Sequence, residues 1–139
     1  MSKIKVHFLG AAGTVTGSKY LIETESKKIL IDCGLFQGVK KIRQLNWEYL
    51  PIDVEEIDCV LLTHAHMDHT GYLPRLIDMG FHKKIYGTAP TLEIAEIILR
   101  DSAKIQEEDA ERANKQKFTK HHPAKALYTV ADVEKTVTH

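Results

Sequence analysis

An alternation of apolar and polar residues opens the chain. Ile4, Val6 and Phe8 are separated by polar residues, and this period of two predicts a β-strand that buries its apolar face. His7 falls on the polar face of the same strand, where an imidazole is more often solvated than coordinated. We therefore expect a half-buried first strand and do not assign His7 to a metal site.

Two further strands follow a loop of glycine and hydroxyl residues at positions 10–18. The segments 19–23 and 29–32 flank a polar turn at 25–28, and this arrangement predicts a β-hairpin. Residues 57–62 are almost all apolar, as in an interior strand that is covered on both faces. The first half of the chain is therefore predicted to form most of a sheet.

Helical spacing appears after this sheet. Leu73, Leu76 and Ile77 recur at intervals of three and four, with Pro74 in the first turn and Gly80 as a C-terminal cap. A short strand is predicted at 84–86, and a long helix from Pro90 to about Asn114. Its apolar stripe has two rows, Leu92, Ala95 and Leu99 in one and Ile94, Ile98 and Ile105 in the other. Strands that alternate with helices predict a layered α/β fold.

Composition is that of an ordinary globular chain. Of the 139 residues, 43% are hydrophobic and 27% are charged, and 19 Lys and Arg balance 19 Asp and Glu. This balance disfavours a simple RNA-coating module, because such a module needs a positive field. No apolar stretch approaches the roughly 20 residues of a membrane span. Cys33 and Cys59 lie apart in strand-like surroundings, so we expect reduced packing residues and a cytoplasmic protein.

Four metal-ligating side chains, His64, His66, Asp68 and His69, stand within six positions directly after the predicted interior strand. Residues two apart in an extended chain point to the same side, so His64 and His66 can hold one ion. Asp68 and His69 follow where the chain must turn, and they can address a second ion. This ligand set suits zinc, ahead of manganese or iron. Two such ions can generate hydroxide from bound water and polarise a phosphoryl or carbonyl oxygen.

Longer motifs extend this picture along nearly the whole chain. They are LGAAGTVTGS at 9–18, LIDCGLFQG at 30–38, DSAKIQEEDA at 101–110 and LYTVADVEK at 127–135. Together with the His-x-His-x-Asp-His run, they make the sequence similar to the N-terminal part of a metallo-β-lactamase-fold hydrolase, and specifically to the β-CASP branch that processes RNA.

This resemblance implies a fold, a cofactor and a substrate. The fold is the N-terminal part of an αββα sandwich, a mixed sheet with helices packed on it. The cofactor is a pair of zinc ions held partly by His64, His66, Asp68 and His69, and the reaction is cleavage of RNA phosphodiester bonds. Asp68 is expected to be a ligand that also helps to position hydroxide. Asp32 is expected to support the cluster by orienting a ligand histidine.

The resemblance also implies that residues 1–139 form only the N-terminal half of a metallo-β-lactamase-like domain. The β-CASP insertion, the C-terminal half and the later His and Asp ligands of that family have no counterpart after His69. We therefore expect an incomplete site with partial or absent metal occupancy. Exposed apolar surface, with a tendency to associate, is also expected.

Other segments keep two interpretations. The loop at 10–18 either cradles a phosphate or shapes the rim of the metal site, and the absence of a nucleotide-binding glycine pattern favours the rim. The acidic stretch 101–111 is interpreted as a solvated helix face. The basic stretch 115–125 either touches phosphates or is a solvated loop. His121 and His122 within it are not assigned as ligands.

Three functional hypotheses follow for the chain. The first is a zinc-dependent ribonuclease, with a DNA nuclease or small-ester hydrolase of the same superfamily as variants. The second is a non-catalytic short form that partners a full-length relative, and the third is the product of a decayed gene. Metal content distinguishes the first from the other two.

Overall fold

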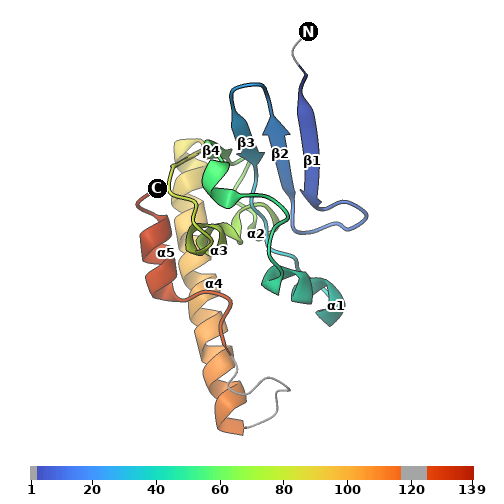
Figure 1. Cartoon of the computed structure of the whole chain (residues 1–139). Helices are drawn as coiled ribbons and strands as arrows, with labels where there is room; N and C mark the ends of the chain where they lie inside the picture. Colours follow the sequence, from blue (N-terminus) through green and yellow to red (C-terminus); the bar gives the residue numbers. More distant parts are fainter. Residues whose placement is uncertain (1–2, 117–124) are drawn as a thin grey trace.

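A five-stranded mixed sheet forms the framework of the molecule (Figure 1). The computed structural model describes residues 3–116 and 125–139. The strands lie side by side in chain order, with β1–β2 and β2–β3 antiparallel and β3–β4 and β4–β5 parallel. Their bounds are Lys5–Gly10 for β1, Lys19–Glu23 for β2, Lys28–Ile31 for β3, Cys59–Leu61 for β4 and Lys84–Tyr86 for β5.

Helices connect and cover these strands. The long helix α4 is accompanied along part of its length by α5 (Figure 1). The α-helices are α1 (Lys40–Arg43), α2 (Met67–Thr70), α3 (Leu73–Asp78), α4 (Ala89–Gln116) and α5 (Val130–Thr136), and the 3₁₀ helices are η1 (Gln44–Trp47) and η2 (Val54–Glu56). In the part of the chain that the structure describes, no helix is both long enough and apolar enough to cross a membrane.

The predicted hairpin is confirmed as β2 and β3, with Tyr20 opposite Ile31 and Leu21 opposite Leu30. The predicted strand at 84–86 and the long helix are confirmed as well. The predicted α/β class, with helices packed on a mixed sheet, is therefore confirmed.

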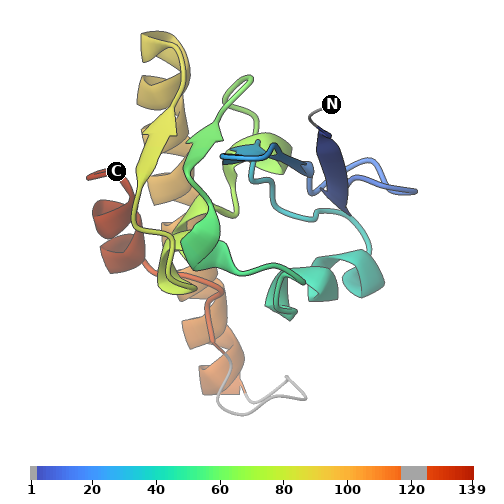
Figure 2. The same ribbon diagram turned by 45° about the horizontal axis from the view of Figure 1, so that its top comes forward.

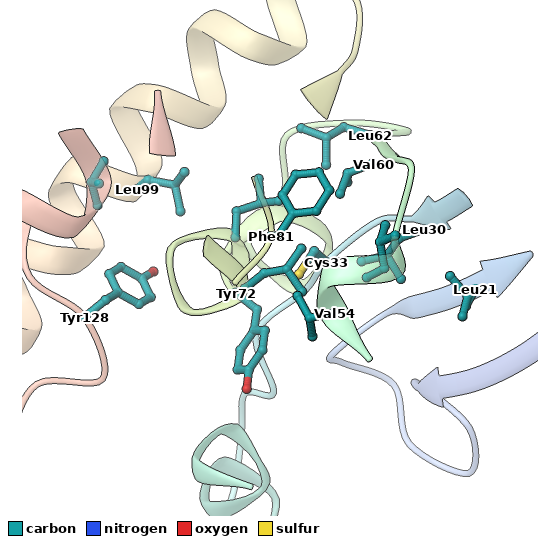
Figure 3. Close-up of a cluster of buried hydrophobic side chains, with 14 of the residues drawn as sticks. Leu21, Leu30, Cys33, Val54, Val60, Leu62, Tyr72, Phe81, Leu99 and Tyr128 are labelled. Carbon is teal, nitrogen blue, oxygen red and sulfur yellow. The ribbon is translucent and has the colours of Figure 1, made fainter. Parts of the chain in front are cut away.

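One face of the sheet carries the core. Leu21, Leu30 and Val60 stand in adjacent strands on this face, and all three are buried. Side chains from α3, α4 and α5 join the same cluster. Figure 3 shows Phe81 beside Val60 and Leu62, and Tyr72 beside Cys33 and Val54. Because these helices pack over this face of the sheet, we call it the covered face.

The opposite face of the sheet is apolar too. Two rows of paired side chains cross it, one of Phe8, Tyr20, Ile31, Leu61 and Tyr86, and the other of Val6, Ile22, Ile29, Cys59 and Lys84. None of these residues belongs to the buried core, and the members on β1 are exposed. Figure 2, a view turned from that of Figure 1, shows α4 passing behind β4 and β5. We call this side the open face.

Two predictions about burial are wrong for the same reason. Ile4, Val6 and Phe8 were expected to be buried, but they lie on the open face at the edge of the sheet and are exposed. The strand at 57–62 was expected to be covered on both faces, but Leu61 lies on the open face and is exposed while Val60 is buried. In each case the residue pattern is apolar, but no layer of the described chain lies over it.

The two rows of the α4 stripe also differ. Ala95 and Leu99 are buried against the core, whereas Ile94 and Ile105 are exposed. A stripe that faces the core needs only a sector of the helix surface. Ile94 and Ile105 lie outside that sector, so their predicted burial is wrong, whereas Ile98 of the same row is half-buried.

The ends of two helices follow known capping rules. Gly80, with φ of 118°, ends α3 in a Schellman motif, in which Phe81 N–H donates to Leu76 O and Gly80 N–H donates to Ile77 O. The Gly80 cap is thus confirmed. The helix α5 was not predicted, although Thr129 and Asp132 form a capping box that is visible in the sequence.

Candidate metal centre

The His-x-His-x-Asp-His run lies at the carboxyl end of β4, where the chain leaves the sheet. After Leu62 the backbone turns into α2, and His66 is the residue that caps this short helix. The Thr70 hydroxyl donates to the carbonyl oxygens of Ala65 and His66 at 3.2 and 3.1 Å. The bend that brings Asp68 and His69 back towards His64 is therefore fixed by local hydrogen bonds.

Asp32 supports this turn from the end of β3, and it is only 3% exposed. Its carboxylate accepts hydrogen bonds from the Thr63 backbone N–H and the Thr63 hydroxyl, both at 2.8 Å, and from His69 Nδ1 at 2.8 Å. The φ of Asp32 is 60°, a left-handed conformation that is uncommon outside glycine. Backbone strain of this kind concentrates at functional sites.

These hydrogen bonds decide which nitrogen of each ring is free. A carboxylate only accepts, so His69 carries its proton on Nδ1 and leaves the lone pair of Nε2 available. The Thr63 hydroxyl donates its proton to Asp32, so it accepts from His64 Nδ1 at 2.8 Å. His64 therefore also presents a free Nε2. Asp32 thus orients two histidines, one directly and one through Thr63.

The donor side chains form one cluster. The ring centroid of His64 lies 4.8 Å from that of His66 and 4.0 Å from that of His69. The Nε2 atom of His69 is 3.4 Å from Asp68 Oδ2. A lone pair and a carboxylate oxygen that face each other at this distance repel each other unless a proton or a cation lies between them.

The loop at 10–18 borders this cluster. Ser18 N–H donates to the Asp68 carbonyl at 3.0 Å, and Gly34 N–H donates to the Ser18 carbonyl at 2.9 Å. A Cβ on Gly34 would lie 1.7 Å from the Asp68 carbonyl oxygen, so only glycine permits this approach. These contacts support the interpretation of the loop as the rim of the site.

The donor chemistry fits a divalent metal, but the site is not closed. Within residues 3–116 and 125–139, no group of three His, Cys, Asp or Glu side chains is arranged so that it could hold a metal ion. Zinc sites hold four ligands, or three and a water. The assignment of His64, His66, Asp68 and His69 to particular ions therefore stays a prediction, while their gathering into one cluster is observed.

Sequence reasoning missed two residues near the site. Thr63 links Asp32 to His64, and its hydroxyl immediately before the first histidine was the available signal. Lys19 is only 1% exposed, and its ammonium lies 4.4 Å from the ring centroids of both Phe36 and Tyr72. Burial lowers the pKa of Lys19 to about 8.

The two histidines of the basic stretch, His121 and His122, lie outside the described residues.

Both cysteines are free, as the sequence predicted. Cys33 is buried beside the site, and burial raises the pKa of its thiol to about 12. A thiol with so high a pKa is neutral near neutral pH, so Cys33 is a packing residue.

Known proteins are similar to this chain in sequence. Ribonuclease TTHA0252 of Thermus thermophilus is 43% identical over 99 residues, which are 71% of this chain and 22% of that protein. Integrator complex subunit 11 of Danio rerio is 38% identical over 76% of this chain and 18% of its own length. Transcription termination factor FttA of Cenarchaeum symbiosum is 37% identical over 75% of this chain and 16% of its own. The chain thus spans about a fifth of these curated relatives.

Solved structures show a partial match. A Cronobacter sakazakii metallo-beta-lactamase has a TM-score of 0.46 at 24% identity, over 71% of this chain and 32% of that one. The short form of human tRNase Z has a TM-score of 0.42 at 25% identity, over 73% and 40%. The sequence model of the metallo-beta-lactamase superfamily matches residues 12–126. The expected resemblance, including that to RNA-processing β-CASP proteins, is confirmed, and the chain belongs to the metallo-beta-lactamase superfamily.

Proposed function

We propose that this chain is the N-terminal half of a metallo-β-lactamase-like domain and supplies the first metal-binding motif of a zinc-dependent phosphodiesterase that acts on RNA. The observation that carries the proposal is the Asp32 network, which leaves Nε2 of His64 and of His69 free beside Asp68. A buried carboxylate that fixes histidine tautomers is typical of the surroundings of a metal ligand set.

The substrate is inferred from relatives. Ribonuclease TTHA0252 is named for cleavage of RNA, and it is 43% identical over the region that contains the cluster. The motif residues are half-buried or exposed, so a polymer can reach them. RNA is therefore the proposed partner of this chain, and the two free cysteines support a reducing, cytoplasmic setting.

Zinc is the cofactor whose chemistry this donor set would hold. His64 and His66 would bind one ion, and Asp68 and His69 a second. Bound zinc would lower the pKa of a coordinated water and polarise a phosphoryl oxygen. The protein residues contribute orientation: Asp32 and Thr63 hold the rings, and Asp68 supplies negative charge next to His69.

Zinc titration of the purified chain, followed by calorimetry, tests the metal-binding part of this proposal. We expect binding that is lost in His69→Ala and weakened about 10–100-fold in Asp32→Asn. The amide oxygen introduced at position 32 could still accept from Thr63 N–H, but the amide nitrogen facing His69 Nδ1 could not accept its proton. His82→Ala is the matched control, because the ring of that histidine bonds to Gly80 O, away from the cluster. Less than about a tenth of an equivalent of bound zinc would contradict the proposal.

Cleavage of single-stranded RNA by the zinc-loaded chain tests the catalytic part. In the intact protein we expect a metal-dependent activity that disappears in His66→Ala, because this change removes a ligand without touching the Asp32 network. A zinc-loaded chain that leaves RNA intact would overturn catalysis by this chain.

That outcome would favour a second candidate, a non-catalytic partner of a full-length relative. Two observations support it: no three donors converge within the described residues, and the open face of the sheet is apolar. Both features are expected of a chain that completes its site and its core only with another polypeptide.

A further inference from the structure

A groove of about 400 Å³ runs alongside the metal cluster. Its walls come from the loop after β3, from α1 and η1, from α2 and from the middle of α4. Met67 lies in the groove wall, and it stands between the candidate ligands His66 and Asp68. The groove therefore adjoins the cluster through the backbone at Met67. Its volume falls within the range of small-ligand sites, roughly 300–1,000 Å³.

The walls of the groove are fixed before any ligand arrives. The Asn46 side chain accepts from Phe36 N–H and donates to the Phe36 carbonyl, both at 2.8 Å. On the opposite wall, Gln106 donates to Ser102 Oγ at 3.0 Å and accepts from Leu127 N–H at 3.0 Å. Both amides are thus committed to the protein, and preorganised walls lower the entropy cost of binding.

Two polar groups of the lining remain available. Gln37 makes only a weak contact with its side-chain nitrogen, 3.4 Å from Met67 Sδ. No ion pair to Arg43 is found among the described residues, although it lines the groove. Between them lie apolar side chains, of which Leu35, Met67 and Ile105 are examples. The groove therefore offers an apolar slot, one free amide and one free guanidinium.

We propose that this groove binds a nucleobase of single-stranded RNA next to the phosphate held at the metal cluster. An apolar slot accepts the face of a base, an amide pairs with its edge, and a guanidinium holds an adjacent phosphate. This inference rests on the proposed function, because it assigns the groove to the same substrate. The RNA would run from the cluster, past Met67, to Arg43.

Binding without metal tests the groove separately from catalysis. The probes are a labelled uridine hexamer and an abasic ribose-phosphate hexamer of equal charge, titrated with the full chain in EDTA and followed by fluorescence anisotropy. We expect the uridine hexamer to bind at least about fivefold more tightly, the range of one stacked base. Equal binding of the two probes, or no binding of either, would overturn the proposal.

Matched variants on α4 test where the base binds. Ile105 is 49% exposed and lines the groove, while Ile97 is 67% exposed on the same helix and does not. Ile105→Trp should fill the groove and weaken binding of the uridine hexamer at least about fivefold, with Ile97→Trp within about twofold of wild type. Circular dichroism verifies the fold of both. If Ile105→Trp is folded and binds as well as Ile97→Trp, the groove is not the site.

A third test concerns the guanidinium of Arg43. Its control is Lys41, an exposed cation of α1 that does not line the groove. Arg43→Ala should weaken both hexamers alike by about threefold to tenfold, and more than Lys41→Ala does. Equal effects of the two variants would remove Arg43 from the proposal. If the chain binds the uridine hexamer more tightly than the abasic one but fails to bind zinc, the proposed phosphodiesterase is overturned and the groove remains a base-binding site. If the chain binds zinc but binds both hexamers equally, the base-binding site is overturned and the proposed phosphodiesterase remains.

Discussion

The two faces of the five-stranded sheet are both apolar, yet the described chain covers only one of them. Leu30 and Val60 stand in neighbouring strands on the covered face and have no exposed surface, whereas Phe8 on the open face is 67% exposed. The side chains are alike in polarity. What differs is connectivity, because α3, α4 and α5, which follow β4 along the chain, all contribute side chains to the core of the same face. An apolar face can pack against another layer, but the connections between strands and helices decide which face the helices of this chain cover.

The largest expected effect of this difference is on stability. Leu30→Ala should lower the free energy of unfolding by about 2–5 kcal/mol, because it leaves a cavity in the core of the covered face. Val6→Ala on the open face should cost less than about 0.5 kcal/mol. Urea denaturation at constant m-value measures both changes. Equal losses would show that the open face is covered in solution.

Cysteine reactivity compares the faces chemically. Cys33 is buried with a pKa of about 12, while Cys59 is on the open face and partly exposed. Iodoacetamide should modify Cys59 at least about 100-fold faster than Cys33 in the folded chain, because thiolate character and access both favour it. Peptide mass spectrometry over time gives the two rates. Modification of Cys33 at the rate of Cys59 would contradict the assigned burial.

Association through the open face is the next prediction. Phe8→Lys should weaken self-association by about tenfold, because a charge on an apolar interface must be desolvated. Ile97→Lys is the control, since Ile97 has the same 67% exposure but lies on α4. Sedimentation velocity over a concentration series measures the effect. A wild-type chain that stays monomeric throughout would refute association by this face.

The smallest effect concerns Lys19, which is buried at the rim of the covered core. Its pKa of about 8 in the folded chain lies below the usual 10.5, so the unfolded chain binds more protons between these values. Stability should therefore rise as the pH increases from 8 to 9, by about 1 kcal/mol relative to Lys19→Met. Above pH 9 the Cys33 thiol acts in the opposite direction. Urea titrations of the wild type and of Lys19→Met at each pH measure this difference. If the stability of the two proteins depends on pH in the same way, the prediction is refuted.

Sequence patterns predicted most of the strands and helices, but not which other parts of the chain pack against them. The hairpin, the strand at 84–86 and the Gly80 cap follow from local residues, and all are observed. Which face of β1 is buried depends on helices that come later in the chain, so alternation alone gave the wrong side. Likewise, spacing indicated a metal cluster, but the role of Thr63 required knowing that β3 and β4 are parallel neighbours.

The orientation of Asp32 has a consequence for how the cluster comes into being. Its hydrogen bonds span 31 positions to Thr63 and 37 to His69. The donors are therefore local in sequence, but their tautomers are set by a distant strand. A peptide that carries only the His-x-His-x-Asp-His run would hold the same ligands without that orientation. The geometry of the cluster therefore depends on the tertiary structure. A metal ion that binds this geometry would in turn stabilise the pairing of β3 with β4.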